Sequence, residues 1–295
     1  MRDILVTGGN GQLGTELQRH RWPDGWRVVA IDLDELDLGD TAAIAAKVAE
    51  RSWAAVISAG AYTAVDKAEE DAVTAWRINA VAPAALAVAC ARADIPIVHV
   101  STDYVFSGDK AGPWHVDDPV CPVSVYGASK LGGELAVATS AKRYVIVRTA
   151  WLVSAHGNNF IKTMLRLGES RDNVSVVADQ HGSPTSAADL AAALADIAVR
   201  LVEDPMARTG TYHFSNAGPT TWYGFACEIF EQARSRGQRP PSVAAIGTSD
   251  YPTPARRPAN SLLSTDAIRR DYGIVARPWR DALSDILDEL IGKSK

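Results

Sequence analysis

The sequence predicts an α/β protein whose first half is a doubly wound parallel sheet. Over residues 1–150, short apolar runs alternate with helical patterns, which is the order typical of βαβ units. A glycine-rich turn follows the first apolar run and leads directly into a helix. We therefore expect residues 1–150, rejoined by parts of 186–216, to form the parallel-sheet domain. The weaker alternation elsewhere predicts a smaller, discontinuous C-terminal lobe, made mainly of residues 151–185 and 217–295.

Composition and charge favour a globular protein without a nucleic-acid or membrane partner. The chain has 295 residues, 47% of them hydrophobic and 22% charged, and a formal net charge of -5. That charge provides no basic field to attract nucleic acid or an anionic membrane. No apolar stretch approaches the roughly 18 residues of a membrane span, and the run after Asp3 is too short for a signal peptide. Cys90, Cys121 and Cys227 are far apart and form no zinc pattern, which favours a reducing, cytoplasmic location.

The glycine-rich turn predicts a dinucleotide site in a Rossmann-type fold. Residues 4–6 are apolar, and Gly8, Gly11 and Gly14 follow them with the spacing G-x-x-G-x-x-G. Glycines there allow a tight turn and let backbone N–H groups approach a pyrophosphate at the helix N-terminus. An ordinary glycine-rich turn is the alternative. The residues predicted to contact the cofactor here are Gly8, Gly11, Gln12, Leu13 and Gly14.

The second predicted strand, residues 27–31, ends at an acidic residue that bears on cofactor choice. Asp32 comes about 20 positions after the first glycines, where a carboxylate accepts hydrogen bonds from the adenosine ribose. It disfavours a 2′-phosphate, so the residues alone favour NADH; a simple turn cap is the alternative. Asp37 and Leu38 follow in a loop that is expected to border the adenine.

The third predicted strand, residues 54–61, is apolar without alternation, as in a strand buried on both faces. The residues expected to pass under the cofactor at its end are Ala61, Tyr62 and Thr63. Irregularly spaced acids over 66–71 predict the solvated start of a helix rather than a metal site. In the helix predicted over 73–91, Asn79 is placed to tie strand ends together or touch the cofactor region, and Pro83 predicts a kink or break.

Three residues near the fourth predicted strand carry the predicted chemistry. Residues 97–100 form that strand, and Thr102 follows its carboxyl end, where it either bonds a ligand or caps a turn. Tyr126 and Lys130 are four apart, so they share one face of a helix. We expect the ammonium to lower the pKa of the phenol from about 10, which suits proton transfer to a sugar oxygen. The loop over 109–122 is expected to be a surface flap.

Periodicity and capping residues predict the elements of the second half. Residues 144–148 and 211–214 are expected to be strands. The pair Thr220-Thr221 is suited to cap a following helix. The helices expected in this half are 161–169, 189–202, 222–236 and 279–291.

A series of short motifs then runs in order through nearly the whole chain. They are Ser101-Thr102-Asp103-Tyr104-Val105-Phe106, Tyr126-Gly127-x-Ser129-Lys130-Leu131, Arg148-Thr149-x-Trp151, Gly157-Asn158-Asn159-Phe160, Asp179-Gln180-x-Gly182-x-Pro184-Thr185 and Arg257-Pro258-x-Asn260-Ser261. With the glycine turn, this series resembles the dTDP-4-dehydrorhamnose reductases, which are extended short-chain dehydrogenases/reductases. The resemblance implies NADPH as the cofactor, with NADH also accepted. It implies hydride transfer to the C4 carbonyl of dTDP-4-dehydro-β-L-rhamnose, in dTDP-rhamnose biosynthesis.

The resemblance also implies roles for single residues. Tyr126 donates the proton to the developing alkoxide, Lys130 holds the nicotinamide ribose and lowers the tyrosine pKa, and Thr102 completes the acid site. The implied substrate-binding residues are Thr102, Asp103, Trp151, Asn158 and Arg257, with Asn159 and Asn260 as weaker candidates. Trp151 either packs against the deoxysugar or is a core residue. Arg257 either binds the diphosphate or is a surface arginine.

Some members of this family bind Mg²⁺ through glutamates at a dimer contact. Glu16 on the first helix and Glu289 near the C-terminus fit two such positions. Residues 186–189, Ser-Ala-Ala-Asp, offer no glutamate for a third. We therefore expect no well-formed metal site, and a monomer or a weak homodimer.

Two alternatives fit the same fold. One is another nucleotide-sugar reductase, dehydratase or epimerase, although a 4,6-dehydratase typically has an acidic pair after its threonine, and here Asp103-Tyr104 follows. The other is a non-catalytic regulatory subunit resembling the β subunit of methionine adenosyltransferase. The intact Thr102, Tyr126 and Lys130 favour the enzyme.

Overall fold

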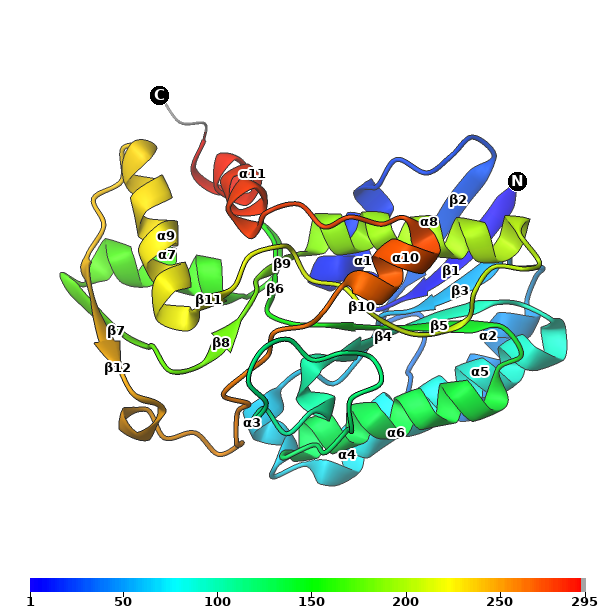
Figure 1. Ribbon diagram of the computed structural model, residues 1–295. Coiled ribbons are helices and arrows are strands. Elements are labelled where there is room, and N and C mark those ends of the chain that lie inside the picture. Colours follow the sequence, from blue (N-terminus) through cyan, green and yellow to red (C-terminus); the bar gives the residue numbers. More distant parts are fainter. Residues whose placement is uncertain (293–295) are drawn as a thin grey trace.

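A six-stranded parallel sheet lies at the centre of the computed structural model, which describes residues 1–292 (Figure 1). Its strand order is β10-β5-β4-β3-β1-β2, and all neighbouring strands are parallel. Strand order reverses at β1, so a crevice opens at the carboxyl ends of β1 and β3. The strands are β1 (Arg2–Thr7), β2 (Trp26–Ile31), β3 (Ala55–Ser58), β4 (Ile97–Thr102), β5 (Tyr144–Thr149) and β10 (Gly210–His213). The predicted doubly wound sheet is confirmed.

Helices cover both faces of this sheet (Figure 1). On one face, Leu17 and Leu194 join the buried side chains of the sheet; on the other, Ile44, Leu86 and Val137 do so. Each of these side chains is at most 1% exposed, and burying one contributes about 1.5–3 kcal/mol. The helices are α1 (Gln12–Arg19) and α8 (Ala187–Glu203) on the first face, and α2 (Thr41–Ala49), α5 (Ala82–Ala93) and α6 (Val125–Ser140) on the second.

A smaller lobe is assembled from the middle and the end of the chain (Figure 1). Its core surrounds the fully buried Phe225 and Trp279, and β7 pairs in parallel with β12 beside it. The lobe contains β6 (Leu152–Val153), α7 (Phe160–Ser170), β7 (Asn173–Val177), β8 (His181–Gly182), β9 (Thr185–Ser186), β11 (Thr220–Thr221), α9 (Trp222–Ser235), β12 (Ser242–Ile246) and α11 (Trp279–Ile291). By contrast, α10 (Asp266–Tyr272) packs on the core of the large sheet through Ile268.

The helix predicted over 73–91 is interrupted, as Pro83 indicated. It consists of α4 (Ala72–Trp76), a π-helical turn η1 (Arg77–Val81) and α5, with Pro83 in the first turn of α5. A wider turn before the proline accommodates its missing N–H. The whole stretch, Ala72–Ala93, is long and apolar enough to cross a membrane, contrary to the sequence prediction. Half of it is buried inside the protein, where it packs against α2 and α6, as a core helix does.

The loop over 109–122 lies mostly at the surface, as predicted, but it is anchored at Trp114. The indole of Trp114 is buried and stacks on Phe106 with the ring centroids 4.5 Å apart. The Trp114 N–H donates to the Leu262 carbonyl, and its indole N–H donates to the Asn260 carbonyl at 3.0 Å. This aromatic anchor ties the loop to the C-terminal third of the chain.

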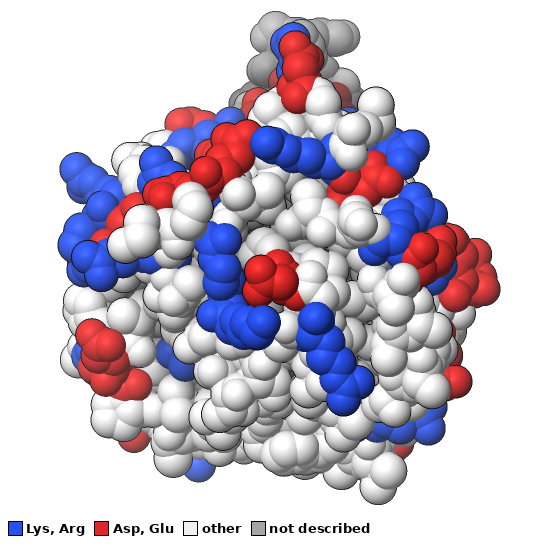
Figure 2. Space-filling view, turned by 90° about the vertical axis from the view of Figure 1, so that its right-hand side faces the viewer, with Lys and Arg blue, Asp and Glu red and all other residues white. Residues whose placement is uncertain are grey.

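The face that lies on the right in Figure 1, and that Figure 2 shows from the front, carries both signs of charge. Lysines and arginines alternate with aspartates and glutamates on this face, without an extended basic area (Figure 2). At the amino end of the sheet, Asp3 binds both Arg27 and Arg51, and Arg2 pairs with Glu203. These ion pairs neutralise the basic side chains locally, which agrees with the net negative charge.

Candidate active site

A cleft of about 840 Å³ opens at the carboxyl ends of the central strands. Its walls contain the residues predicted to bind the cofactor and most of those predicted to bind substrate. These are Gly8, Gly11, Gln12, Leu13, Gly14, Asp32, Asp37, Leu38, Ala61, Tyr62, Thr63, Thr102, Asp103, Tyr126, Lys130, Trp151 and Asn158. Asn10, Gly60, Ile78 and Tyr104 also line the cleft. They were not among the predicted site residues, although Asn10 lies inside the glycine turn and Tyr104 inside the motif of residues 101–106. Segments far apart in sequence thus share one cavity.

The glycine turn is packed so tightly that side chains would not fit. Gly8 has φ +76°, and a Cβ there would lie 2.7 Å from the Gly60 Cα. A Cβ at Gly14 would lie 2.1 Å from the Gly8 carbonyl oxygen. The backbone of the turn is therefore bare where it faces the cleft at the N-terminus of α1. Such a cradle suits a pyrophosphate, whose charge the backbone N–H groups and the helix end stabilise.

Asp32 stands at the end of β2 and lines the cleft beside the glycine turn. Its carboxylate accepts hydrogen bonds from the Asn10 N–H at 2.7 Å and from the Leu33 N–H at 2.8 Å. Asp32 therefore caps a turn, which was the alternative to binding the ribose. It also lines the cleft where the adenosine ribose is predicted to lie. The two interpretations do not exclude each other, because a carboxylate has about four acceptor sites.

Asn79 connects the floor of the cleft to the helix that carries Tyr126 and Lys130. Its amide oxygen accepts from the Tyr62 N–H at 2.8 Å, and its NH₂ donates to the Tyr62 carbonyl at 3.0 Å. The same NH₂ donates to the Ser129 Oγ at 3.0 Å. Asn79 is 1% exposed, so these bonds are shielded from water. The predicted tying role thus takes the form of a link from the loop after β3 to α6.

Thr102, Tyr126 and Lys130 meet at the mouth of the crevice. Thr102 ends β4, while Tyr126 and Lys130 lie one turn apart near the start of α6, which Ser124 caps. The Thr102 hydroxyl donates to Asp103 at 3.0 Å and accepts from the Tyr104 N–H at 3.2 Å. The Lys130 ammonium donates to the Val100 carbonyl at 2.6 Å. All three side chains line the cleft.

The prediction that Lys130 lowers the pKa of Tyr126 is wrong for this structure. Burial raises the pKa of Tyr126 to about 12; a hydrogen bond with Thr102 lowers it, and the charge of Asp103 raises it. Burial also lowers the pKa of Lys130 to about 8, against the raising effect of Glu134. Desolvation outweighs any attraction between the two groups, because both side chains are enclosed. The phenol is therefore neutral at pH 7 and available as a proton donor.

Asp103 is a buried carboxylate directly beside the threonine. Burial raises its pKa to about 6, and hydrogen bonds with Ser261 and Thr102 only partly oppose that effect. Ser261 belongs to the C-terminal third of the chain and is itself buried. Asp103 therefore lies where the end of β4 meets residues 257–261, the motif that begins with Arg257 and ends with Ser261.

Trp151 lies where the sheet gives way to the smaller lobe, and it is held between two partners. It has φ +50°, which is uncommon for a residue with a large side chain, and it is the second residue after the end of β5. Its indole stacks on Trp222 with ring centroids 3.7 Å apart. A Cβ at Gly182 would lie 2.5 Å from the same indole. Trp151 is partly buried and lines the cleft, so one aromatic surface is fixed in the cavity wall.

Arg257 is not among the residues that line this cleft, and a diphosphate contact through it stays a prediction. Its guanidinium binds both oxygens of Asp66, at 3.0 and 2.8 Å. Asp66 lies in α3 (Val65–Ala68), directly after the loop under the cleft. Glu69, in the same acidic group, accepts from the Val125 N–H at 2.9 Å and so helps to start α6. These acids are therefore partnered, and not only a solvated helix start.

The asparagines that were weaker candidates have structural partners. The Asn159 side chain caps α7 by accepting from the Lys162 N–H, and it donates to Gln12 at 2.9 Å. Asn260 donates to the Lys110 and Gly112 carbonyls and accepts from the Leu262 N–H. All the polar groups of the Asn260 amide are thus used inside the protein. Asn158 alone of the three lines the cleft.

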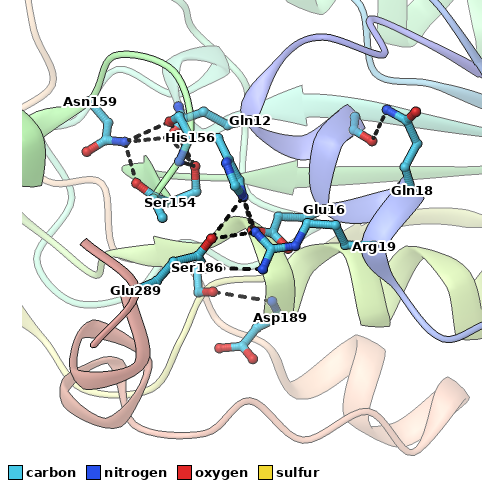
Figure 3. Close-up of polar contacts among 12 residues, drawn as sticks. Gln12, Glu16, Gln18, Arg19, Ser154, His156, Asn159, Ser186, Asp189 and Glu289 are labelled. Atoms are coloured by element: carbon cyan, nitrogen blue, oxygen red, sulfur yellow. Dashed lines mark hydrogen bonds and ion pairs between the residues drawn. The ribbon is translucent and has the colours of Figure 1, made fainter. Parts of the chain in front are cut away.

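Glu16 and Glu289 lie outside the cleft and close to each other (Figure 3). Arg19 lies between them: its guanidinium is 2.7 Å from Glu289 and 3.8 Å from Glu16. Within residues 1–292 no group of three or more His, Cys, Asp or Glu side chains is arranged to hold a metal ion.

Comparisons with known proteins agree with this geometry. Residues 1–291 match the family described as RmlD substrate binding domain. The dTDP-4-dehydrorhamnose reductase of Burkholderia thailandensis is 43% identical over 297 residues, covering 98% of this chain and 99% of that protein. The crystal structure of a dTDP-4-dehydrorhamnose reductase from Clostridium acetobutylicum has a TM-score of 0.91 at 38% identity, covering 98% of this chain and 99% of the other.

A second solved structure bears on the cofactor. The dTDP-4-dehydrorhamnose reductase of Bacillus anthracis, in complex with NADP, has a TM-score of 0.90 and 36% identity, covering 98% of this chain and all of that chain. Similarity of this extent, over both sheet and smaller lobe, shows common ancestry of the entire chain. The protein therefore belongs to the dTDP-4-dehydrorhamnose reductase family of oxidoreductases, as its motifs predicted.

Proposed function

We propose that this protein uses NADPH to reduce the C4 keto group of dTDP-4-dehydro-β-L-rhamnose, giving dTDP-β-L-rhamnose. The observation that carries the proposal is the cleft itself. One cavity contains the bare glycine turn, Thr102 and Trp151 near the ends of β4 and β5, and Tyr126 and Lys130 on α6. The names of the relatives and the NADP in one of them support the same substrate and cofactor.

The chain offers a fitting cradle for a dinucleotide. Side chains at Gly8 or Gly14 would collide with backbone, and Asp32 faces the place of the adenosine ribose. When bound, the nicotinamide supplies the hydride; the protein supplies position and a proton. Lys130 holds the nicotinamide ribose, and Ala61, Tyr62 and Thr63 form the floor. Because Asp32 disfavours a 2′-phosphate, we expect NADH to be accepted beside NADPH.

Tyr126 is the proton donor in this proposal. A phenol with a pKa of about 12 stays protonated at neutral pH, which is the form that reduction of a ketone requires. As charge develops on the C4 oxygen, Tyr126 gives its proton to that oxygen. Thr102, which hydrogen-bonds to Tyr126, orients the phenol and contacts the same oxygen. The product is an alcohol, so the proton is consumed at each turnover.

The smaller lobe binds the nucleotide sugar in this proposal, and the sheet domain of residues 1–150 binds the cofactor. Trp151 offers its indole to the partly apolar face of the deoxysugar, since the opposite side is packed on Trp222. Asp103 and Asn158 line the same cavity and are suited to bond sugar hydroxyls. Arg257 pairs with Asp66 next to the loop after β3, and we retain it as a candidate partner of the diphosphate.

The experiment that tests this function follows the absorbance of NADPH at 340 nm with dTDP-4-dehydrorhamnose as substrate. We expect a stoichiometric loss of absorbance and a product whose NMR spectrum is that of dTDP-β-L-rhamnose. Elimination of water, or epimerisation without loss of absorbance, would contradict the proposal. Catalytic silence together with a copurifying protein would instead indicate a regulatory subunit.

We further propose that the protein works in the cytoplasm, as a monomer or a weak homodimer. Its cysteines are free thiols: Cys90 is buried, Cys121 is exposed and Cys227 is intermediate. Exposed thiols persist in reducing compartments. Sedimentation equilibrium over a range of protein concentrations measures the assembly; a tight dimer at nanomolar concentration would contradict this part of the proposal.

A further inference from the structure

Four charged or titratable side chains from three segments meet behind the cleft (Figure 3). Glu16 and Arg19 come from α1, Glu289 from α11, and His156 from the loop that follows β6. The Arg19 guanidinium binds Glu289 through two hydrogen bonds, of 2.7 and 3.3 Å, and contacts the His156 ring. The His156 Nε2 lies 3.2 Å from Glu16 and 3.7 Å from Glu289. We call these four residues the α1–α11 cluster.

The two carboxylates of this cluster stand where the resemblance implies glutamates that bind Mg²⁺. The chain's own donors do not fit that ion. A guanidinium already lies between Glu16 and Glu289, and Mg²⁺ requires six oxygen ligands in octahedral geometry. The two carboxylates thus already share a cation that belongs to the chain.

The third position that a metal would need is also missing. In the segment 186–189, Ala187 and Ala188 have no side-chain donor, and Asp189 points away from the cluster (Figure 3). Its carboxylate accepts from the Asn216 amide at 2.7 Å and from the Arg277 guanidinium at 3.0 Å. These bonds hold Asp189 at the start of α8 and leave it unavailable to the α1–α11 cluster.

We propose that Arg19 is the permanent cation of this site and fastens α11 to α1 without a metal ion. Arg19 donates to the carboxylate of Glu289, which lies more than 250 positions away in the sequence. The effect of this pairing is reciprocal: the hydrogen bond raises the pKa of Arg19 and lowers the pKa of Glu289. The pair therefore joins the helix of the glycine turn to the last helix of the smaller lobe.

The same cluster also positions the wall of the cofactor cleft. The His156 carbonyl accepts from the Ser154 hydroxyl and from the Asn159 amide. The side-chain oxygen of Gln12 accepts from the same Asn159 amide at 2.9 Å and lies 3.0 Å from the Ser154 hydroxyl, whose single proton serves one of its two acceptors at a time. Gln12 and Asn158 line the cleft. Arg19 is therefore a positioning residue, and its loss should loosen this wall and weaken NADPH binding while the catalytic groups stay in place.

The first test needs no variant. Thermal unfolding and NADPH fluorescence titration of the whole protein are measured in EDTA and in MgCl₂ at equal ionic strength. We expect the same Tm, within about a degree, and the same Kd for NADPH in both. A Tm or an NADPH affinity that falls in EDTA and recovers in MgCl₂ would overturn the proposal. Neither readout depends on turnover, so failure here is distinct from failure of the proposed reductase activity.

The second test removes the internal cation. Arg19→Met leaves Glu16, Glu289 and His156 facing one another without the guanidinium between them. In EDTA we expect a Tm roughly 2–4 °C lower than wild type, as for a loss of one ion cluster from a chain of this size. We also expect a several-fold weaker Kd for NADPH, and recovery of neither on adding MnCl₂, because the side chains that remain in residues 1–292 are not arranged to hold a metal ion.

Controls separate the cluster from the loss of any surface charge. Arg234→Met removes an exposed ion pair with Glu231, 2.6 Å apart on α9, and should change neither Tm nor Kd. If Arg19→Met fails to fold, Glu289→Gln replaces it as the test. This change keeps the shape of α11 and removes the charge that pairs with Arg19, so it should give the same lower Tm. A Tm and Kd equal to wild type in both cluster variants would overturn the proposal.

Discussion

Arg148 and Glu134 form a bidentate ion pair that joins β5 to the helix carrying Tyr126 and Lys130. The Arg148 Nε donates to Glu134 at 2.9 Å and its terminal nitrogen donates at 2.7 Å, with both side chains at most 6% exposed. The guanidinium also lies 5.0 Å from the centre of the Phe106 ring. Glu134 thus fixes α6 on the sheet and, through its charge, raises the pKa of Lys130.

Removing one partner of this pair should strongly destabilise the fold. Glu134→Gln keeps the shape and leaves the guanidinium buried without a counter-charge, which costs about 3–5 kcal/mol of unfolding free energy. Urea denaturation measures the loss. The matched control Glu231→Gln removes an exposed pair with Arg234, and should cost at most about 1 kcal/mol. Equal losses in the two variants would mean that the buried pair contributes no more than a surface pair.

The buried Lys130 should set the alkaline limit of activity. Its pKa is lowered to about 8, so the ammonium loses its charge as pH rises through that value, while Tyr126 stays protonated up to about 12. We expect kcat/KM for NADPH to be level at neutral pH and to fall above about pH 8. Because Glu134 raises the pKa of Lys130, Glu134→Gln should move this limb to lower pH, and Glu231→Gln should not. A profile that stays level to pH 10 would contradict the assignment.

The contact between Gly182 and Trp151 should control affinity for the sugar. Gly182→Ala places a methyl group about where the indole lies, because a Cβ there would be 2.5 Å from it. We expect KM for the nucleotide sugar to rise about tenfold, or ~1.4 kcal/mol, with an unchanged Kd for NADPH. At Gly247 a Cβ would meet its neighbours at 3.5 Å or more, so Gly247→Ala is the control. A parallel loss of NADPH affinity would show general misfolding instead.

Asp32 should discriminate between the two forms of the cofactor. Asp32→Ala removes an acceptor for the ribose hydroxyl and a charge that repels a 2′-phosphate. We expect the ratio of kcat/KM with NADH to that with NADPH to fall by about tenfold. The variant also frees the Asn10 and Leu33 N–H groups, which affects both cofactors alike. An unchanged ratio would mean that Asp32 acts only as a turn cap.

The parts of the site that could be predicted from sequence are those specified by local spacing. The glycine turn, Asp32 and the Tyr126–Lys130 pair each sit within a few residues of a recognisable strand or helix. Parallel strands then bring their carboxyl ends to one edge, so these residues line one cleft. Pro83 likewise predicted that its helix is interrupted, because a proline lacks the backbone N–H that its own helical turn needs.

What could not be predicted depends on contacts between distant segments. Trp222, which supports Trp151, belongs to a helix of the other lobe, and no local pattern links the two. The guanidinium of Arg257 forms an ion pair with Asp66, although 191 positions in the sequence separate the two residues. The pKa of Tyr126 depends on how completely the fold buries the phenol. The Tyr-x-x-x-Lys spacing carries no information about that burial.

The most direct test of the account is the turnover of Tyr126→Phe with NADPH and dTDP-4-dehydrorhamnose. This change removes one hydroxyl, so NADPH fluorescence titration should give the wild-type Kd. We predict a kcat that is roughly 10²–10⁴-fold lower than that of wild type, because the proton donor is lost. A kcat within a few-fold of wild type, with NADPH bound normally, would contradict the claim that Tyr126 protonates the substrate.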